Sequence, residues 1–188
     1  MIETTTLGPA MQRAGLLEDP VPPAAARWLA TFCEAFGLAC TSVEDALFEV
    51  RELRAEATLV PALELERLRS RSVLFFLDTV GQYVDDQAEL RDLPLEHDLA
   101  AIAGEFGLEP HEAAGAVRMA LTGRSAGPDL ALLFPLLGHD RILIRIGAIS
   151  SHLLHGRGLD PIKTGPGGNP FRPLAGTKPA ADAAGESR

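Results

Sequence analysis

Apolar residues recur at three-and-four spacing along most of the chain, and no convincing strand pattern interrupts them. This spacing predicts an all-α fold, a multi-helix bundle of about seven helices. Prolines and capping residues place the helix starts near residues 23, 41, 61, 94, 110, 128 and 139. The start near 41 rests on Thr41 with Glu44 three residues later, which resembles a capping box.

The helices are expected to form two packed subdomains, 23–92 and 93–155. An extended lead, 1–22, is expected before them, and a disordered tail rich in Gly, Pro and Ala, 156–188, after them. The first residues lack the basic start and apolar centre of a signal peptide. No apolar run approaches the roughly 18 residues of a membrane helix. We therefore expect a cytoplasmic protein without a membrane association.

The segment 123–127 reads Gly-Arg-Ser-Ala-Gly and fits the nucleophile elbow of serine hydrolases. That elbow requires a strand before the serine, whereas the alanine-rich residues 110–121 predict a helix that ends at Gly123. A helical connection is therefore the preferred interpretation, and no catalytic residue is assigned. No phosphate-binding loop or metal-ligand set is evident either, so no cofactor or metal is expected.

Several motifs of the same region match one family. They are Arg118 to Gly123 (RMALTG), Gly127 to Leu130 (GPDL), and Leu136 to Arg141 (LLGHDR) followed by Arg145-Ile146. Together they resemble the C-terminal, anticodon-binding region of bacterial glutamyl-tRNA synthetases, which are class I synthetases. The likeness is dense over about 94–150, faint over 10–93 and absent afterwards.

The resemblance implies a fold like that anticodon-binding region, as a stand-alone chain. The family's catalytic domain carries a His-Ile-Gly-His-type segment and a Lys-x-Ser-Lys-type loop, and neither occurs here. The implied function is a non-catalytic tRNA-binding module of translation, with a glutamate-type tRNA as its partner. Such a module could also act in trans with a separate catalytic chain.

Five residues are the candidates for RNA contact: Arg118, Thr122, Arg124, Arg141 and Arg145. On the helix that begins near 139, Arg141 and Arg145 fall on one arc with His152 and His155, opposite an arc of isoleucines. Arginine can contact phosphates or stack on an unpaired base. Two alternatives stay open: a solvated arginine face paired with acids such as Asp140, and Arg118 as a buried ion-pair member.

Charge weighs against the RNA interpretation. The formal net charge is −9, and residues 1–92 hold 8 Arg against 16 Asp and Glu. Strong nonspecific nucleic-acid binding needs a basic footprint instead. The acidic face of the helix near 41–56 is interpreted as a solvated exterior, or as a surface that docks a partner or repels tRNA. The alternative function is therefore a protein-interaction or regulatory module derived from a synthetase. The oligomeric state is left open.

Overall fold

The computed structural model describes residues 1–58, 60–61, 65 and 68–155. All regular elements within these ranges are α-helices, which confirms the all-α prediction. The predicted disordered tail, 156–188, lies outside the described residues. No helix in the described ranges is both long and apolar enough to cross a membrane.

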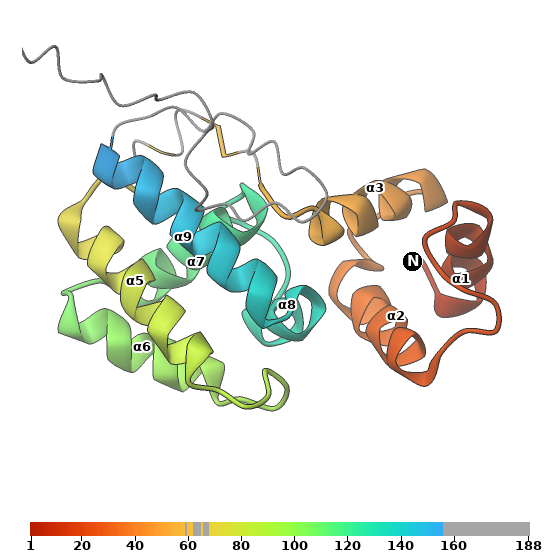
Figure 1. Ribbon diagram of the computed structural model, residues 1–188, viewed down its shortest axis with the longest axis horizontal. Helices are drawn as coiled ribbons and strands as arrows, with labels where there is room; N and C mark the ends of the chain where they lie inside the picture. Colours follow the sequence, from red (N-terminus) through yellow and green to blue (C-terminus); the bar gives the residue numbers. More distant parts are fainter. Residues whose placement is uncertain (59, 62–64, 66–67, 156–188) are drawn as a thin grey trace, which may run out of the picture.

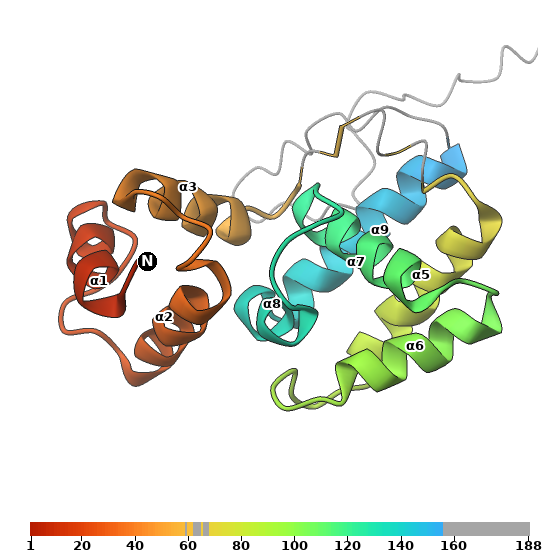
Figure 2. The same cartoon turned by 180° about the vertical axis from the view of Figure 1, so that it is seen from behind.

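The helices form two groups that lie side by side (Figures 1 and 2). The first group comprises α1 (Thr4–Arg13), α2 (Pro23–Phe36) and α3 (Val43–Arg54). The second comprises α5 (Arg71–Asp85), α6 (Leu95–Glu105), α7 (Pro110–Thr122), α8 (Leu130–Leu137) and α9 (His139–His155). Helix α8 packs on α2 and α3 and so joins the groups, and one buried core runs through both.

The first twenty residues differ from the extended lead that the sequence predicted. Residues 4–13 form α1, whose buried side chains include Leu7 and Met11, and α1 packs on α2 and α3. The Gly8-Pro9 pair reads as a helix breaker, but burial of the apolar stripe outweighs its unfavourable propensity. The chain before α1 is also fixed, because the Ile2 amide donates to the Gly37 carbonyl at 2.8 Å.

The predicted boundary near residue 92 is also wrong. Helix α5 packs chiefly on α9 and also on α6 and α7, so it belongs to the second group. It begins at Arg71 rather than near 61, because the Ser70 side chain accepts the Val73 amide at 3.0 Å and caps it there. Along the chain, the first group therefore ends with α3 and the second begins with α5.

Helix α3 begins one residue later than the Thr41–Glu44 pattern indicated. Ser42 is its N-cap, and the reciprocal capping box joins Ser42 to Asp45. Thr41 donates its hydroxyl to the same Asp45 carboxylate, so the threonine supports the cap without being it. These hydrogen bonds lower the pKa of Asp45, the Thr41 hydroxyl contributing most.

Candidate nucleic-acid interface

The turn between α7 and α8 is held by its own hydrogen bonds. Gly123 ends α7 with φ +73°, a left-handed conformation that favours glycine. The Thr122 hydroxyl donates to the Arg118 carbonyl at 2.8 Å and accepts the Arg124 amide at 3.3 Å. Asp129 then caps α8 by accepting the Ala131 amide at 2.9 Å. A helix, not a strand, therefore leads to Ser125, which confirms the helical connection over the hydrolase elbow.

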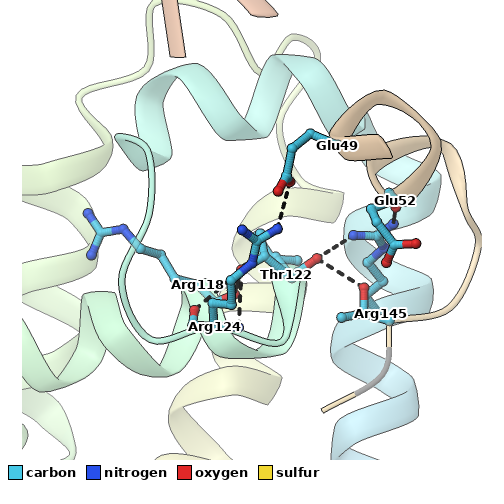
Figure 3. Close-up of polar contacts among 8 residues, drawn as sticks. Glu49, Glu52, Arg118, Thr122, Arg124 and Arg145 are labelled. Atoms are coloured by element: carbon cyan, nitrogen blue, oxygen red, sulfur yellow. Dashed lines mark hydrogen bonds and ion pairs between the residues drawn. The ribbon is translucent and has the colours of Figure 1, made fainter. Parts of the chain in front are cut away.

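Arg118 also stabilises this turn through a hydrogen bond to its backbone. Its side chain is half-buried on α7, and its Nε donates to the Pro128 carbonyl at 3.0 Å. No acidic partner of Arg118 is present in the described part of the chain, so the buried ion-pair alternative finds no support. Arg118 and Arg145 lie on opposite sides of Arg124 (Figure 3).

Arg124 is the most accessible of the five candidates. Its side chain is 54% exposed and forms a 2.6 Å ion pair with Glu49 of α3, whose side chain is only 16% exposed. The hydrogen bond to Glu49 raises the pKa of Arg124. The contact joins the α7–α8 turn to the first helical group across 75 positions of sequence.

A hollow of about 530 Å³ opens beside this ion pair. It lies between the end of α2, the start of α3 and the turn, and the residues that shape it include Phe36, Cys40, Phe48, Glu49, Arg124 and Pro128. Phe48 is 56% exposed although it is a large aromatic residue. We name this surface the turn face. It presents an aromatic ring, a guanidinium and backbone in one concavity, the groups that bind unpaired nucleotides.

Arg145 lies elsewhere, in the interior, with only 2% of its surface exposed. Its Nη2 donates to the carbonyls of Glu52 and Ala55, both at 2.6 Å, and its Nη1 donates to the Leu121 carbonyl. These carbonyls belong to the C-terminal ends of α3 and α7, which lack partners within their own helices. The expected arginine face on α9 is therefore wrong at Arg145, because this face packs on two helix ends.

Burial determines the electrostatics of this guanidinium. Burial, and to a smaller extent the charge of Arg141, lower the pKa of Arg145 to about 10, although Glu52 acts in the opposite direction. Arg145 is still charged at neutral pH, and a cation at the C-terminal ends of two helices is favourable. The Nε of Arg145 has no hydrogen-bond partner among the described residues.

Arg141, one turn earlier on α9, continues the same arrangement in a half-buried position. Its Nε donates to the Arg54 carbonyl at 3.3 Å and its Nη1 to the Leu137 carbonyl at 3.2 Å. Its guanidinium lines a second hollow with Trp28 and Arg54, away from the turn face. The structure thus brings Arg118, Thr122 and Arg124 together at the turn and separates Arg141 and Arg145 from them.

Three residues with chemistry suited to a ligand were missed from the sequence: Phe48, Trp28 and Arg54. Phe48 carried a signal, because it is an aromatic residue outside the apolar stripe of α3. Trp28 and Arg54 carried none, since each fits an ordinary helix. Of the two histidines on the arginine arc of α9, His152 is buried and His155 exposed. No group of three metal-ligating side chains gathers within the described ranges.

The family model described as an anticodon binding domain matches residues 26–149, which run from within α2 to within α9 and include the lining of both hollows. The chain belongs to this anticodon-binding domain family. The synthetase-like resemblance of the 118–145 segment is thereby confirmed at the level of the family.

Two curated relatives agree with this assignment. The glutamate–tRNA ligase of Chloroflexus aurantiacus is 26% identical over 145 residues, covering 74% of this chain. The glutamate–tRNA ligase of Roseiflexus sp. is 28% identical over 163 residues, covering 78% of this chain. In each case the match spans 29% of the relative's length. The similarity is therefore to a part of these ligases.

Proposed function

We propose that this protein binds tRNA through the turn face, with the unpaired nucleotides of an anticodon arm as the ligand. The observation that carries the proposal is the hollow beside the α7–α8 turn, which exposed Phe48 and Arg124 line together with Pro128 within the matched family region. Aromatic and guanidinium planes bind splayed bases by stacking. The glutamate–tRNA ligases among the relatives suggest a glutamate-type tRNA.

Phe48 and four of the five candidate residues have distinct parts in this proposal. Phe48 and the guanidinium of Arg124 contact bases or phosphates, because both side chains are more than half exposed. Arg118 and Thr122 act through the turn, since their side chains form hydrogen bonds with its backbone. Arg145 supports the fold and does not reach the RNA.

The test is the affinity for tRNA, measured by fluorescence anisotropy at several salt concentrations. We expect binding tighter than the roughly 10⁻⁴–10⁻⁶ M of nonspecific association, and weakening as salt rises. Phe48→Ala should weaken binding about fivefold to a hundredfold, the range of one lost base–aromatic stack of about 1–3 kcal/mol. A glutamate tRNA should bind more tightly than an unrelated tRNA.

The matched control is Arg13→Gln, which removes an exposed arginine from the end of α1, outside the turn face. It should change the affinity less than twofold. Absence of tRNA binding at low salt, with the variants folded, would refute the proposal. Equal weakening by Arg13→Gln and Phe48→Ala would refute the assignment of the turn face.

A protein partner is the second candidate, and the charge of α3 favours it. Glu44, Asp45 and Glu52 are exposed on this helix, and the chain has a net charge of −9. This surface would attract a basic protein surface, such as one on a separate chain that carries ligase activity. Binding of a ligase catalytic domain that is lost on charge reversal of these acids, without tRNA binding, would favour this candidate.

A further inference from the structure

A second hollow, of about 490 Å³, lies between α2, the end of α3 and the α8–α9 turn. Its lining includes Trp28, Arg54, Pro135, Leu136, Gly138 and Arg141. We call it the arginine pocket. The Trp28 indole is fixed there, because its Nε1 donates to the Leu136 carbonyl at 2.9 Å. The Arg54 guanidinium lies over the indole, 5.1 Å from its centroid.

The two guanidiniums of the arginine pocket have only carbonyl partners. Arg54 donates to the Leu16 carbonyl, and Arg141 donates to the carbonyls of Arg54 and Leu137. Within the described ranges neither side chain forms an ion pair with a carboxylate. Each guanidinium has five N–H donors, so several remain available for a ligand.

The two positive charges are close enough to affect one another. Burial lowers the pKa of Arg54, and the charge of Arg141 lowers it further. Arg141 acts on Arg145 in the same way. This unneutralised positive charge stands out in a chain whose net charge is −9. An anion bound between Arg54 and Arg141 would relieve their repulsion.

We propose that the arginine pocket is a phosphate-binding site, with Arg54 and Arg141 donating to the phosphate oxygens and Trp28 forming one wall. Planar guanidinium groups suit phosphate because they can donate two parallel hydrogen bonds. The start of α9 supports the site, since Gly138 lines the pocket and a helix N-terminus favours an anion.

The phosphate comes from the backbone of an RNA bound at the turn face, and this part rests on the proposed function. Trp28 lies in the arginine pocket, and Phe36 lies in the hollow of the turn face. Stacked rings of Trp28, Phe32 and Phe36 follow one side of α2, with centroids 5.5 and 5.0 Å apart. Trp28 and Phe36 are eight residues apart, which is about 12 Å along the axis of α2, a short span for an RNA strand.

The chain contains a single tryptophan, Trp28, so its fluorescence reports on the arginine pocket alone. The experiment titrates the full chain with inorganic phosphate, while chloride holds the ionic strength constant. We expect a saturable change in emission, and at least a tenfold loss of apparent affinity in Arg54→Gln and Arg141→Gln. Arg51→Gln removes an exposed arginine from the same helix as Arg54 and should leave the response unchanged.

No saturable response in the wild type would overturn the site, as would equal responses in wild type and both folded pocket variants. If one variant fails to fold, the other decides. A second titration uses a single-stranded RNA without terminal phosphates, which offers only phosphodiesters. The same response to this RNA supports the backbone as the source, and a response to inorganic phosphate alone overturns it.

Failure of the two proposals can be told apart. A phosphate response without tRNA binding leaves the pocket intact and refutes the proposed function. Binding of tRNA that depends on Phe48, with no response of Trp28 fluorescence to phosphate or RNA, refutes the pocket and keeps the function.

Discussion

Arginines of the 118–145 segment lie both at the turn face and at the contact of α9 with the C-terminal end of α3, which we call the junction. Their environments at the two places are opposite. At the turn face, Arg124 is 54% exposed and its partner is a single carboxylate. At the junction, Arg145 is 2% exposed and its partners are backbone carbonyls of two other helices. A surface arginine can exchange its partner for a ligand, whereas a buried one completes the fold.

The junction has a specific physical basis. The last carbonyls of a helix have no partner within it. Arg145 donates hydrogen bonds to the carbonyls of Glu52, Leu53 and Ala55. Arg141 donates one to the Arg54 carbonyl, which lies between them in the sequence. Two arginines one turn apart on α9 thus satisfy four consecutive carbonyls at the end of α3. The fold alone is therefore a sufficient reason for Arg141 and Arg145 to be present, and their presence does not require RNA binding.

The largest effect is expected for Arg145→Gln. This change leaves carbonyls at the end of α3 without donors, at about 1–3 kcal/mol for each unsatisfied group, whereas the Leu121 carbonyl of α7 still accepts from the Thr58 hydroxyl. We expect a loss of about 3 kcal/mol or more in the free energy of unfolding, and a fall in Tm of roughly 6–12 °C. Denaturant unfolding followed by circular dichroism measures both the midpoint and its slope.

Arg141→Gln is the matched control for this prediction. Arg141 is half-buried and its two hydrogen bonds are 3.2 and 3.3 Å long, so its loss should cost only about 1 kcal/mol. Equal losses in the free energy of unfolding for the two variants would show that burial of Arg145 does not determine its contribution to stability. The contrast with the turn face would then fail.

A smaller loss of stability is expected for Gly123→Ala, because Gly123 sets the direction of the turn. Its φ of +73° is unfavourable for any residue with a Cβ, by roughly 1–2 kcal/mol. Gly123→Ala should therefore lower the free energy of unfolding by about 1 kcal/mol and weaken tRNA binding together with it. Thermal unfolding and anisotropy on the same sample measure the two effects.

Gly104→Ala is the control for that change. Gly104 lies within α6, and an added Cβ there would meet no atom within 4 Å. Alanine is the better helix former, so stability should be unchanged or slightly higher. If Gly104→Ala lowered the free energy of unfolding as much as Gly123→Ala, the destabilisation could not be assigned to the left-handed backbone conformation of Gly123.

Local patterns predicted much of the second helical group. Pro110 and Gly123 bound α7 as expected, and Ile142, Ile146 and Ile149 form the buried side of α9. These signals are local, because caps and apolar stripes act within one helix. The same reasoning failed for α1, because packing of Leu7 and Met11 against α2 and α3 stabilises a helix that contains Gly8 and Pro9.

The position of Arg145 could not be predicted in this way. A helical arc shows which residues share a side of α9, but it does not show what lies against that side. The acceptors of Arg145 are carbonyls of Glu52, Leu53 and Ala55, at least 90 positions away in sequence. Backbone carbonyls carry no sequence signal, so only the tertiary arrangement of α3 and α9 reveals the contact.

The smallest change in stability is expected for Glu49→Gln, and it tests the turn face most directly. The Arg124 end of this ion pair is exposed, and ion pairs at the surface contribute about 0–1 kcal/mol, so the free energy of unfolding should change by less than about 0.5 kcal/mol. The change also frees the Arg124 guanidinium and removes a negative charge beside the hollow. If RNA binds there, tRNA affinity should rise by about threefold at low salt, and the gain should shrink as salt screens the charge. Glu96→Gln, an exposed acid on α6, should give no such gain, and an equal gain in both variants would assign the effect to net charge rather than to the turn face.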